Sequence, residues 1–486
     1  MKRITIDPIT RLEGHGKIEI FVGDDGQVVN TYFQIPELRG FEKFAQGRPV
    51  EELPRITTRI CGVCPEAHHM AGAKACDAVY HVEPPPTGRK LRELLYSTFF
   101  VADHSVHFYV LAGPDFVCGP KAPVAERNVL GLIQKVGIDA GKRFFGMRRQ
   151  AHEVIKLLGG KAIHQVTALP GGVSRGINEE ERKHIEAVAE DFVDFGQFTL
   201  DVFEDVVLGN QGYVDLVTGS TFRHETYYIG LVDENNCPNF YDGQIRVVDQ
   251  DGKETAKFHP SEYLEHIAEH VEPWTYLKYP YLKAVGWKGF VDGKDSGVYR
   301  SAPLARLNVA DGMSTPKAQA AYERMYSVLG GRPCHQTLAY HWARVIEIQA
   351  AAERMLELAR DPDITSDDFR TVPTATPTEG VGCVEAPRGL LIHHYKTDER
   401  GVVTDANLVV GTTNNYAPMT LSIKKAATDL ISGLDEVDEG SLNMVEMAFR
   451  AYDPCFGCAT HNLGDEGSLE INIRRRDGTL IHTARR

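Results

Sequence analysis

The stretches Cys61-Gly62-Val63-Cys64 and Cys455-Phe456-Gly457-Cys458 are two cysteine pairs of equal spacing near opposite ends of the chain. Each pair is followed by a histidine, His68 or His461. A Cys-x-x-Cys loop directs two sulfur atoms at one point, so two loops supply four soft ligands suited to zinc, iron–sulfur or nickel chemistry. The fold is therefore expected to bring together segments that lie about 390 residues apart.

Length and composition indicate a soluble globular protein. The chain has 486 residues, 42% of them hydrophobic and 25% charged, and the length favours two to four domains. Its net charge of -14 argues against a general nucleic-acid binder. The sequence has neither a signal-peptide core nor a run of 18 apolar residues, so we expect a cytoplasmic protein that is not integral to a membrane.

Hydrophobic periodicity predicts an α+β fold that is predominantly helical, with long helices bundled in the core and strands at the periphery. Alternation predicts a β region over residues 1–35, and residues 210–310 are expected to form an irregular, strand-containing insertion. The chain from 360 to about 420 is expected to be irregular and polar. Helices are predicted at about residues 67–79, 88–112, 122–158, 178–207, 316–329, 335–360, 420–434 and 442–452.

The cysteine pairs alone leave the metal open. Two Cys-x-x-Cys pairs most often form a structural zinc site, but its pairs usually lie about 15 to 20 residues apart in a small module. A gap of about 390 residues is unusual for that purpose, and an iron–sulfur cluster meets the same objection. Zinc therefore leads on the pairs alone, with redox metals as the alternatives.

Each cysteine pair belongs to a longer motif, and two further motifs lie elsewhere in the chain. They are Arg59-x-Cys61-Gly-x-Cys64-x-x-x-His68, Asp453-Pro-Cys455-x-x-Cys458-x-x-His461, Arg11-x-Glu13-Gly-His15 and Ala386-Pro387-Arg388-Gly389. In this order and spacing they resemble the large, catalytic subunit of nickel–iron hydrogenases, and the resemblance covers residues 6–461. It implies the fold of that subunit, together with the reversible splitting of dihydrogen into protons and electrons.

The resemblance also implies the metals. A nickel would be held by four thiolates, beside an iron that carries carbon monoxide and cyanide. Cys61 and Cys455 would bind nickel alone, whereas Cys64 and Cys458 would bridge nickel and iron. A magnesium or iron ion would be bound by three further groups, which offer the oxygen and nitrogen ligands that a hard ion prefers. These groups are the Glu42 carboxylate, the Leu408 carbonyl and His461.

The catalytic roles follow from the same resemblance. Glu13 would be the first carboxylate of a proton relay, and Cys458 a nearby thiolate base. Arg388 would lie over the open metal face as an orienting and electrostatic group, held by Asp103 and Asp453 through charge-assisted hydrogen bonds.

The resemblance also assigns groups that would contact the diatomic ligands and a bridging sulfur. Arg388 and Thr412 would donate hydrogen bonds to cyanide, next to Gly411, which replaces a proline found in many members. His68 would support a bridging sulfur.

The electron acceptor is expected on other subunits. The chain has no further cysteine set, so an iron–sulfur small subunit is required, and no Gly-rich dinucleotide fingerprint is present. The stretches 239–243 and 271–274 resemble the type that feeds electrons to heterodisulfide reductase in methanogens and some bacteria. An NAD-linked or deazaflavin-linked hydrogenase is the alternative within the family.

The last residues resemble a maturation signal. Residues 462–486 would be removed by an endopeptidase that cleaves after His461, which leaves residues 1–461 as a single intertwined catalytic unit. Two alternatives belong to other classes: the quinone-site subunit of respiratory complex I, which has lost the cysteines retained here, and a non-catalytic structural zinc protein.

Overall fold

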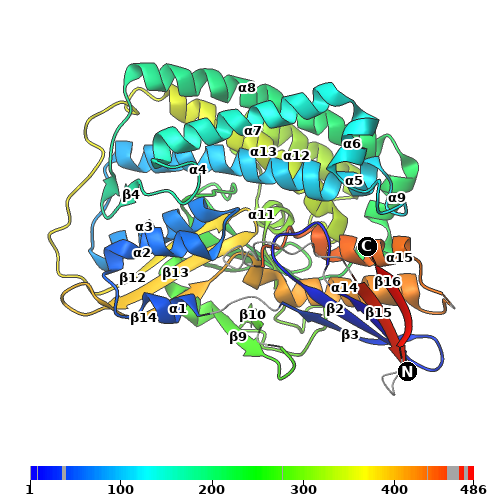
Figure 1. The fold of residues 1–486 in the computed structure, drawn as a ribbon. Helices are drawn as coiled ribbons and strands as arrows, with labels where there is room; N and C mark the ends of the chain where they lie inside the picture. The colour runs from blue at the N-terminus through cyan, green and yellow to red at the C-terminus, as the bar shows by residue number, and fades with distance from the viewer. Residues whose placement is uncertain are drawn as a thin grey trace.

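A computed structural model of the chain describes residues 2–7, 9–35, 40–275, 277–434, 436–456, 470–475 and 480–485. Long helices form one side of the molecule, and sheets with shorter helices form the other (Figure 1). The predicted α+β fold with a helical bundle is confirmed. Among the described residues, no helix combines the length and the apolar character needed to cross a membrane.

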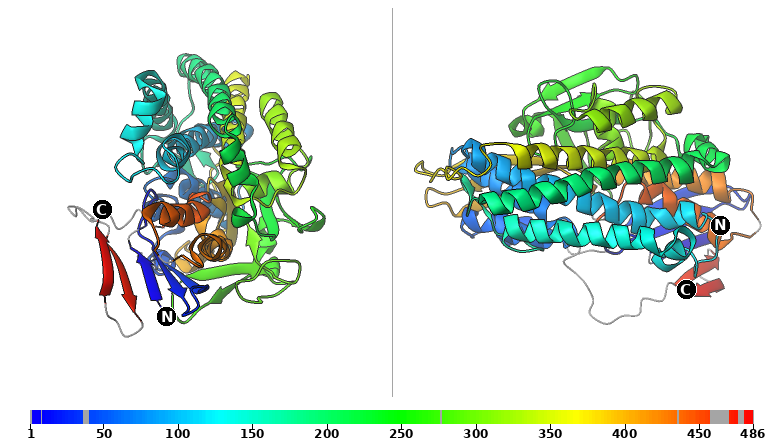
Figure 2. Two further views of the ribbon diagram at one scale, coloured as in Figure 1. Left: turned by 90° about the vertical axis from the view of Figure 1, so that its right-hand side faces the viewer. Right: turned by 90° about the horizontal axis from the view of Figure 1, so that it is seen from above.

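Four long helices make the bundle, and Figure 2 shows three of them, α7, α8 and α13, running side by side. They are α4 (Pro86–Val106), α7 (Ile138–Gly159), α8 (Glu179–Phe203) and α13 (Tyr340–Arg360). The predicted N-cap of α8 is present, because Asn178 Oδ1 accepts from the Glu181 N–H at 2.9 Å. Both α4 and α8 continue as short π-helices, His107–Ala112 and Glu204–Leu208.

The helix predicted over 122–158 is wrong in its first part. Asn128 caps a short helix α6 (Val129–Val136), and Gly137, with φ 92°, separates it from α7. A left-handed glycine ends a helix at little cost, which the apolar pattern does not reveal. The remaining helices of this side are α5 (Gly113–Val117), α9 (Gln211–Thr218), α11 (Pro303–Val309) and α12 (Pro316–Leu329).

The two ends of the chain share one sheet, whose strand order is β16-β15-β1-β2-β3. β1 pairs antiparallel with β15, where Arg3 lies opposite Arg474. Figure 1 shows the two strands from the C-terminal end of the chain (red) beside the strands from its N-terminal end (blue). The strands are β1 (Lys2–Ile6), β2 (Lys17–Val22), β3 (Val28–Gln34), β15 (Glu470–Arg475) and β16 (Leu480–Arg485).

The expected strand-containing region between 210 and 310 forms one four-stranded sheet and one hairpin. The sheet consists of β6 (Tyr227–Val232), β7 (Gln244–Val248), β8 (Glu254–Phe258) and β11 (Tyr299–Arg300). The hairpin of β9 (Ile267–Val271) and β10 (Lys278–Leu282) follows α10 (Tyr263–His266).

A three-stranded sheet replaces much of the region predicted to be irregular. It consists of β12 (Glu379–Ala386), β13 (Gly389–Thr397) and β14 (Val403–Val409). Most of β13 is buried on both faces, so its apolar and polar residues do not alternate as they do in half-exposed strands.

Helix α3 (Pro65–Val79) packs on this sheet, next to α1 (Phe41–Ala45) and α2 (Leu53–Ile56). Helices α14 (Tyr416–Ile431) and α15 (Glu439–Arg450) lead to the second cysteine pair. Two short strands complete the described elements, β4 (Ala168–Leu169) and β5 (Gly172–Val173).

Candidate metal centre

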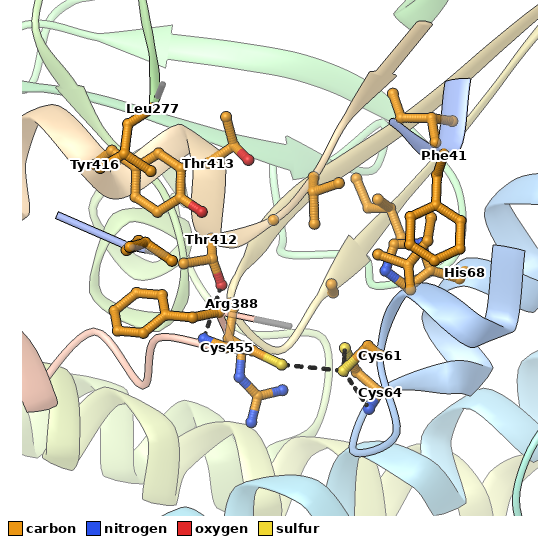
Figure 3. Close-up of a pocket in the computed structure, with 18 of the residues that line it drawn as sticks. Phe41, Cys61, Cys64, His68, Leu277, Arg388, Thr412, Thr413, Tyr416 and Cys455 are labelled. Atoms are coloured by element: carbon orange, nitrogen blue, oxygen red, sulfur yellow. Dashed lines mark hydrogen bonds between the residues drawn. The ribbon is translucent and has the colours of Figure 1, made fainter. Parts of the chain in front are cut away.

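The sulfur atoms of the first cysteine pair meet Cys455 of the second. Cys61 Sγ lies 2.6 Å from Cys64 Sγ and 3.0 Å from Cys455 Sγ. All three sulfurs lie within 4.8 Å of one another (Figure 3). Cys61 follows a 3-10 turn and Cys64 immediately precedes α3, so one turn of chain aims both side chains at the same point. Cys458 and His461 fall outside the described residues.

The N-terminal segment lies against the second pair. Glu13 and Cys455 form a parallel β-bridge, and the Phe456 N–H donates to the Glu13 carbonyl at 3.0 Å. The Cys455 Sγ donates to Glu13 Oε2 at 2.6 Å. The Cys455 N–H donates to the Thr412 hydroxyl oxygen at 3.1 Å. These contacts place the predicted relay carboxylate directly beside a sulfur of the cluster.

A buried ionic network, which the sequence did not indicate, anchors this segment. Asp115 accepts from Arg11 and, at 2.7 Å, from Arg450, which also pairs with Glu446 at 2.6 Å. Thr10 donates to the same glutamate at 2.7 Å. Because these partners are separated by up to 436 positions in sequence, no local pattern predicts the network.

Arg388 is held between two carboxylates. Its Nη1 donates to Asp103 Oδ2 at 3.0 Å, and its Nη2 lies 2.9 Å from Asp453 Oδ2. The three residues are at most 3% exposed. Burial alone would lower the pKa of the guanidinium, but Asp103 and Asp453 outweigh burial and raise it, so Arg388 stays charged.

Asp453 adopts the left-handed region at φ 56°, a strained conformation for a residue that is not glycine. The surrounding contacts therefore hold its carboxylate on Arg388 against a backbone preference. Burial, with a smaller contribution from the nearby Asp103, raises the pKa of Asp453 to about 7 against the opposing effects of Arg388 and Arg344.

The sulfur cluster favours a thiolate. Hydrogen bonding with Cys455 and Cys61 lowers the pKa of the Cys64 thiol to about 6, against the opposing effect of burial. A thiolate is the form that binds metal, so Cys64 is prepared for ligation near neutral pH.

A cavity of about 120 Å³ adjoins the sulfurs (Figure 3). Its wall includes the remaining predicted site residues of the described chain, namely Glu42, His68, Arg388, Leu408 and Thr412. His68 shares a hydrogen bond of 3.2 Å with His393, a residue that the sequence analysis did not single out. Alternation along 389–397 would have placed His393 on the same face as Leu391, which also lines the cavity.

The residues fit a nickel–iron group better than a structural zinc ion. Buried thiolates provide soft ligands, and the cavity beside them carries a charged guanidinium and a hydroxyl. In a structural zinc site, four protein ligands close the coordination shell and leave no open position for a further ligand.

Comparison with known proteins gives consistent matches. The family described as nickel-dependent hydrogenase matches residues 39–130 and 216–461, and one described as HoxL-like matches residues 3–38. The chain is 51% identical to an iron-sulfur subunit of the F420-non-reducing hydrogenase of Archaeoglobus profundus, over 100% of both chains. It is 40% identical to a subunit of the F420-non-reducing hydrogenase of Methanothermobacter marburgensis, over 99% of each.

A solved structure of an NAD+-reducing nickel–iron hydrogenase in the H2-reduced state is also similar. It superimposes with a TM-score of 0.87 at 37% identity, over 95% of this chain and 100% of that one.

Proposed function

The chain belongs to the nickel-dependent hydrogenase family and is an oxidoreductase that acts on dihydrogen; from that premise we propose how its residues carry the reaction. The observation that carries the proposal is the convergence of Cys61, Cys64 and Cys455 on one cavity that a buried, charged Arg388 also lines. Cys61 and Cys455 would bind nickel, and Cys64 and Cys458 would bind both the nickel and an iron that carries carbon monoxide and cyanide. When bound, this centre supplies the redox-active site at which dihydrogen is cleaved.

Glu13 takes the proton away from the site. Its Oε2 lies 2.6 Å from Cys455 Sγ, within the range of direct proton transfer. Arg388 stays protonated, because two carboxylates raise its pKa. Its role is therefore electrostatic: it orients polar ligands in the cavity and stabilises negative charge there, together with the Thr412 hydroxyl.

Glu42, the Leu408 carbonyl and His461 would hold a second ion, magnesium or iron. Glu42 and Leu408 line the same cavity, although they come from α1 and β14. A carboxylate and a carbonyl oxygen are the ligands that a hard cation prefers. His461 is the third ligand in this proposal.

Electrons leave through an iron–sulfur small subunit docked over the Cys61–Cys64 loop. Cys61 is 2% exposed and Cys64 5%, whereas Gly62 between them is exposed, so the site comes close to the surface there. His164 binds the Thr58 carbonyl beside this loop at 3.1 Å, and the adjacent Ile163 is 50% exposed. An exposed apolar residue next to the loop suits a protein interface.

Heterodisulfide reductase is the proposed acceptor beyond the small subunit, in keeping with the F420-non-reducing type of the relatives. Purified complex should reduce a heterodisulfide with dihydrogen when that enzyme is added. Reduction of NAD or deazaflavin instead would assign the alternative acceptor. We also propose that an endopeptidase removes residues 462–486, which intact-mass analysis of active enzyme tests.

Metal analysis of the complex tests the central proposal. Nickel and iron, infrared bands of carbon monoxide and cyanide, and dihydrogen-dependent viologen reduction are expected together. Cys61→Ser should lose nickel and activity. Cys76→Ala is the matched control, because this buried thiol contacts the Val50 carbonyl rather than the cluster. Zinc alone, without the infrared bands, would overturn the proposal.

A further inference from the structure

Three buried side chains form a row of hydrogen bonds that leads away from the cavity. His68 Nδ1 lies 3.2 Å from His393 Nε2, and His393 Nδ1 lies 2.7 Å from the Tyr395 hydroxyl. All three residues are at most 1% exposed. The row is therefore shielded from solvent, and its protons are set by the three groups and their immediate neighbours.

The backbone fixes the order of the row. Cys64 precedes α3 and His68 lies one turn further on, so the ring shares the helix end that carries the sulfur. His393 and Tyr395 are two residues apart on β13 and point to one face of the sheet, against which α3 packs. Arg388 immediately precedes the same strand. Strand β13 and the residue before it thus supply both the Arg388 guanidinium and the two side chains that hold the His68 ring.

Burial sets the protonation states. It lowers the pKa of His68 to about 3, and burial together with His68 lowers that of His393 well below its usual value. Burial also raises the pKa of the Tyr395 phenol. Each imidazole is therefore neutral with a single N–H, and the phenol keeps its proton.

We propose that Tyr395 and His393 are positioning residues that fix His68 in the tautomer with its proton on Nε2. The 2.7 Å contact has a length that suits donation by the phenol O–H, and the 3.2 Å contact joins two ring nitrogens, one of which donates to the other. The phenol then donates to His393 Nδ1, and His393 Nε2–H donates to His68 Nδ1. This leaves Nε2–H of His68 for the cavity.

The thiolates favour this direction. His68 lines the cavity together with Cys61 and Cys64, and its Nδ1 is already engaged. The ring and the sulfurs border one cavity, and negative charge on the sulfurs favours an N–H over a lone pair at His68 Nε2. The opposite arrangement turns the phenol proton to Thr57 and presents a lone pair of His68 to the thiolates, which repels them.

The tautomer of His68 depends only on contacts among the described residues. Its effect on the metal centre rests on the proposed function. There, Nε2–H stabilises negative charge on the cluster sulfurs and so tunes the reduction potential of the metals that they bind.

The first test reads the tautomer in the metal-free full chain labelled with ¹⁵N-histidine. Ring-nitrogen NMR signals, assigned with His68→Gln, should show His68 as the Nε2–H form. Tyr395→Phe removes the terminal donor and should change the tautomer ratio by roughly tenfold, the equivalent of one hydrogen bond. His393→Gln breaks the row in the middle and is the second variant.

Tyr263→Phe is the matched control. Tyr263 is a buried phenol that contacts His394 Nδ1 at 3.0 Å, on the opposite face of β13. It should leave the His68 signals unchanged.

The second test measures the midpoint potential of the nickel EPR signal in the assembled enzyme at equal nickel content. Tyr395→Phe and His393→Gln should shift it, and Tyr263→Phe should not. An Nδ1–H tautomer of His68 in the wild type, or unchanged tautomer and potential in Tyr395→Phe, would overturn the inference. Absence of nickel from the wild-type complex would instead contradict the proposed function, and the NMR result would stand independently.

Discussion

Arg388 is the residue whose geometry is most demanding, because one guanidinium reaches Asp103 at 3.0 Å and Asp453 at 2.9 Å. Arg388→Lys keeps the charge but replaces a planar fork by a point charge that cannot hold both carboxylates in the same way. We expect turnover of dihydrogen per nickel to fall roughly 10²-fold to 10³-fold, the usual effect of losing a preorganised electrostatic group. Activity and nickel content measured on the same sample check this.

Arg92→Lys is the matched control for Arg388→Lys. Arg92 is 0% exposed and forms a fork with Asp77 and with the Gly172 carbonyl. Its replacement should lower the unfolding temperature and leave turnover per nickel unchanged. Wild-type turnover in Arg388→Lys would show that the fork has no role in the reaction.

For individual residues, the sequence predicted as site residues those that belong to recognisable motifs. The cysteine pairs, Glu13 and Arg388 were found in this way, and the structure places Cys61, Cys64 and Cys455 together with them. The resemblance also supplied Asp103, which lies on a helix 285 positions from Arg388 and has no local signal. His393 and Tyr395 were missed because their meaning depends on His68, which contacts them only through tertiary packing.

Helix α3 is the element that positions the first cysteine pair, and its backbone closely approaches β12 at Gly380 and Gly382. A Cβ atom at Gly382 would lie 2.2 Å from the Ala71 carbonyl oxygen and 2.3 Å from the Ala75 nitrogen. Gly382→Ala should therefore push the start of α3 away from the sheet and move Cys64. We expect reduced nickel content and a lower unfolding temperature, measured by metal analysis and calorimetry.

Gly146→Ala provides the comparison, since it lies within α7 and a Cβ there meets nothing within 4 Å. It should be neutral or stabilise the protein by up to about 1 kcal/mol, because alanine favours helix. Full nickel occupancy in Gly382→Ala would mean that α3 adapts without moving the site.

The elements also show where sequence patterns stop being informative. The helix predicted over residues 316–329 has the same bounds as α12, because apolar residues recur at helical spacing along a half-exposed helix. The sheet of β12, β13 and β14 was missed, since β13 is buried on both faces and most of its pattern is uniform. The break at Gly137 was missed because glycine also occurs within helices, as Gly146 does.

For the molecule as a whole, the large core buries many neutral histidines. Among the described residues, seven histidines that are at most 4% exposed have pKa values lowered mainly by burial, including His69 and His104 at about 4 and His341 at about 3. The others are His68, His107, His224 and His393. The unfolded chain binds protons at these positions below pH 6.5 and the folded chain does not, so their contribution to stability is complete above pH 6.5 and is lost as the pH falls towards 4.

Each such histidine removes about 1.4 kcal/mol of stability per pH unit within that window. Three buried carboxyls act in the opposite direction, because burial raises the pKa of Glu66 to about 8 and those of Glu385 and Asp453 to about 7. The histidines outnumber them, so unfolding takes up protons on balance. Since a protein is typically stable by only about 5–15 kcal/mol, we expect the full chain to unfold at mildly acidic pH.

Denaturant unfolding from pH 7.5 to pH 5 measures this dependence. The free energy of unfolding should fall steeply below about pH 6.5, the usual pKa of histidine. His341→Gln should reduce the slope by about one proton. His184→Gln, at an exposed position of α8, should leave the slope unchanged. Equal stability at pH 7 and pH 5.5 would mean that the buried rings accept protons within the folded chain, which requires that water or a carboxylate reach them there.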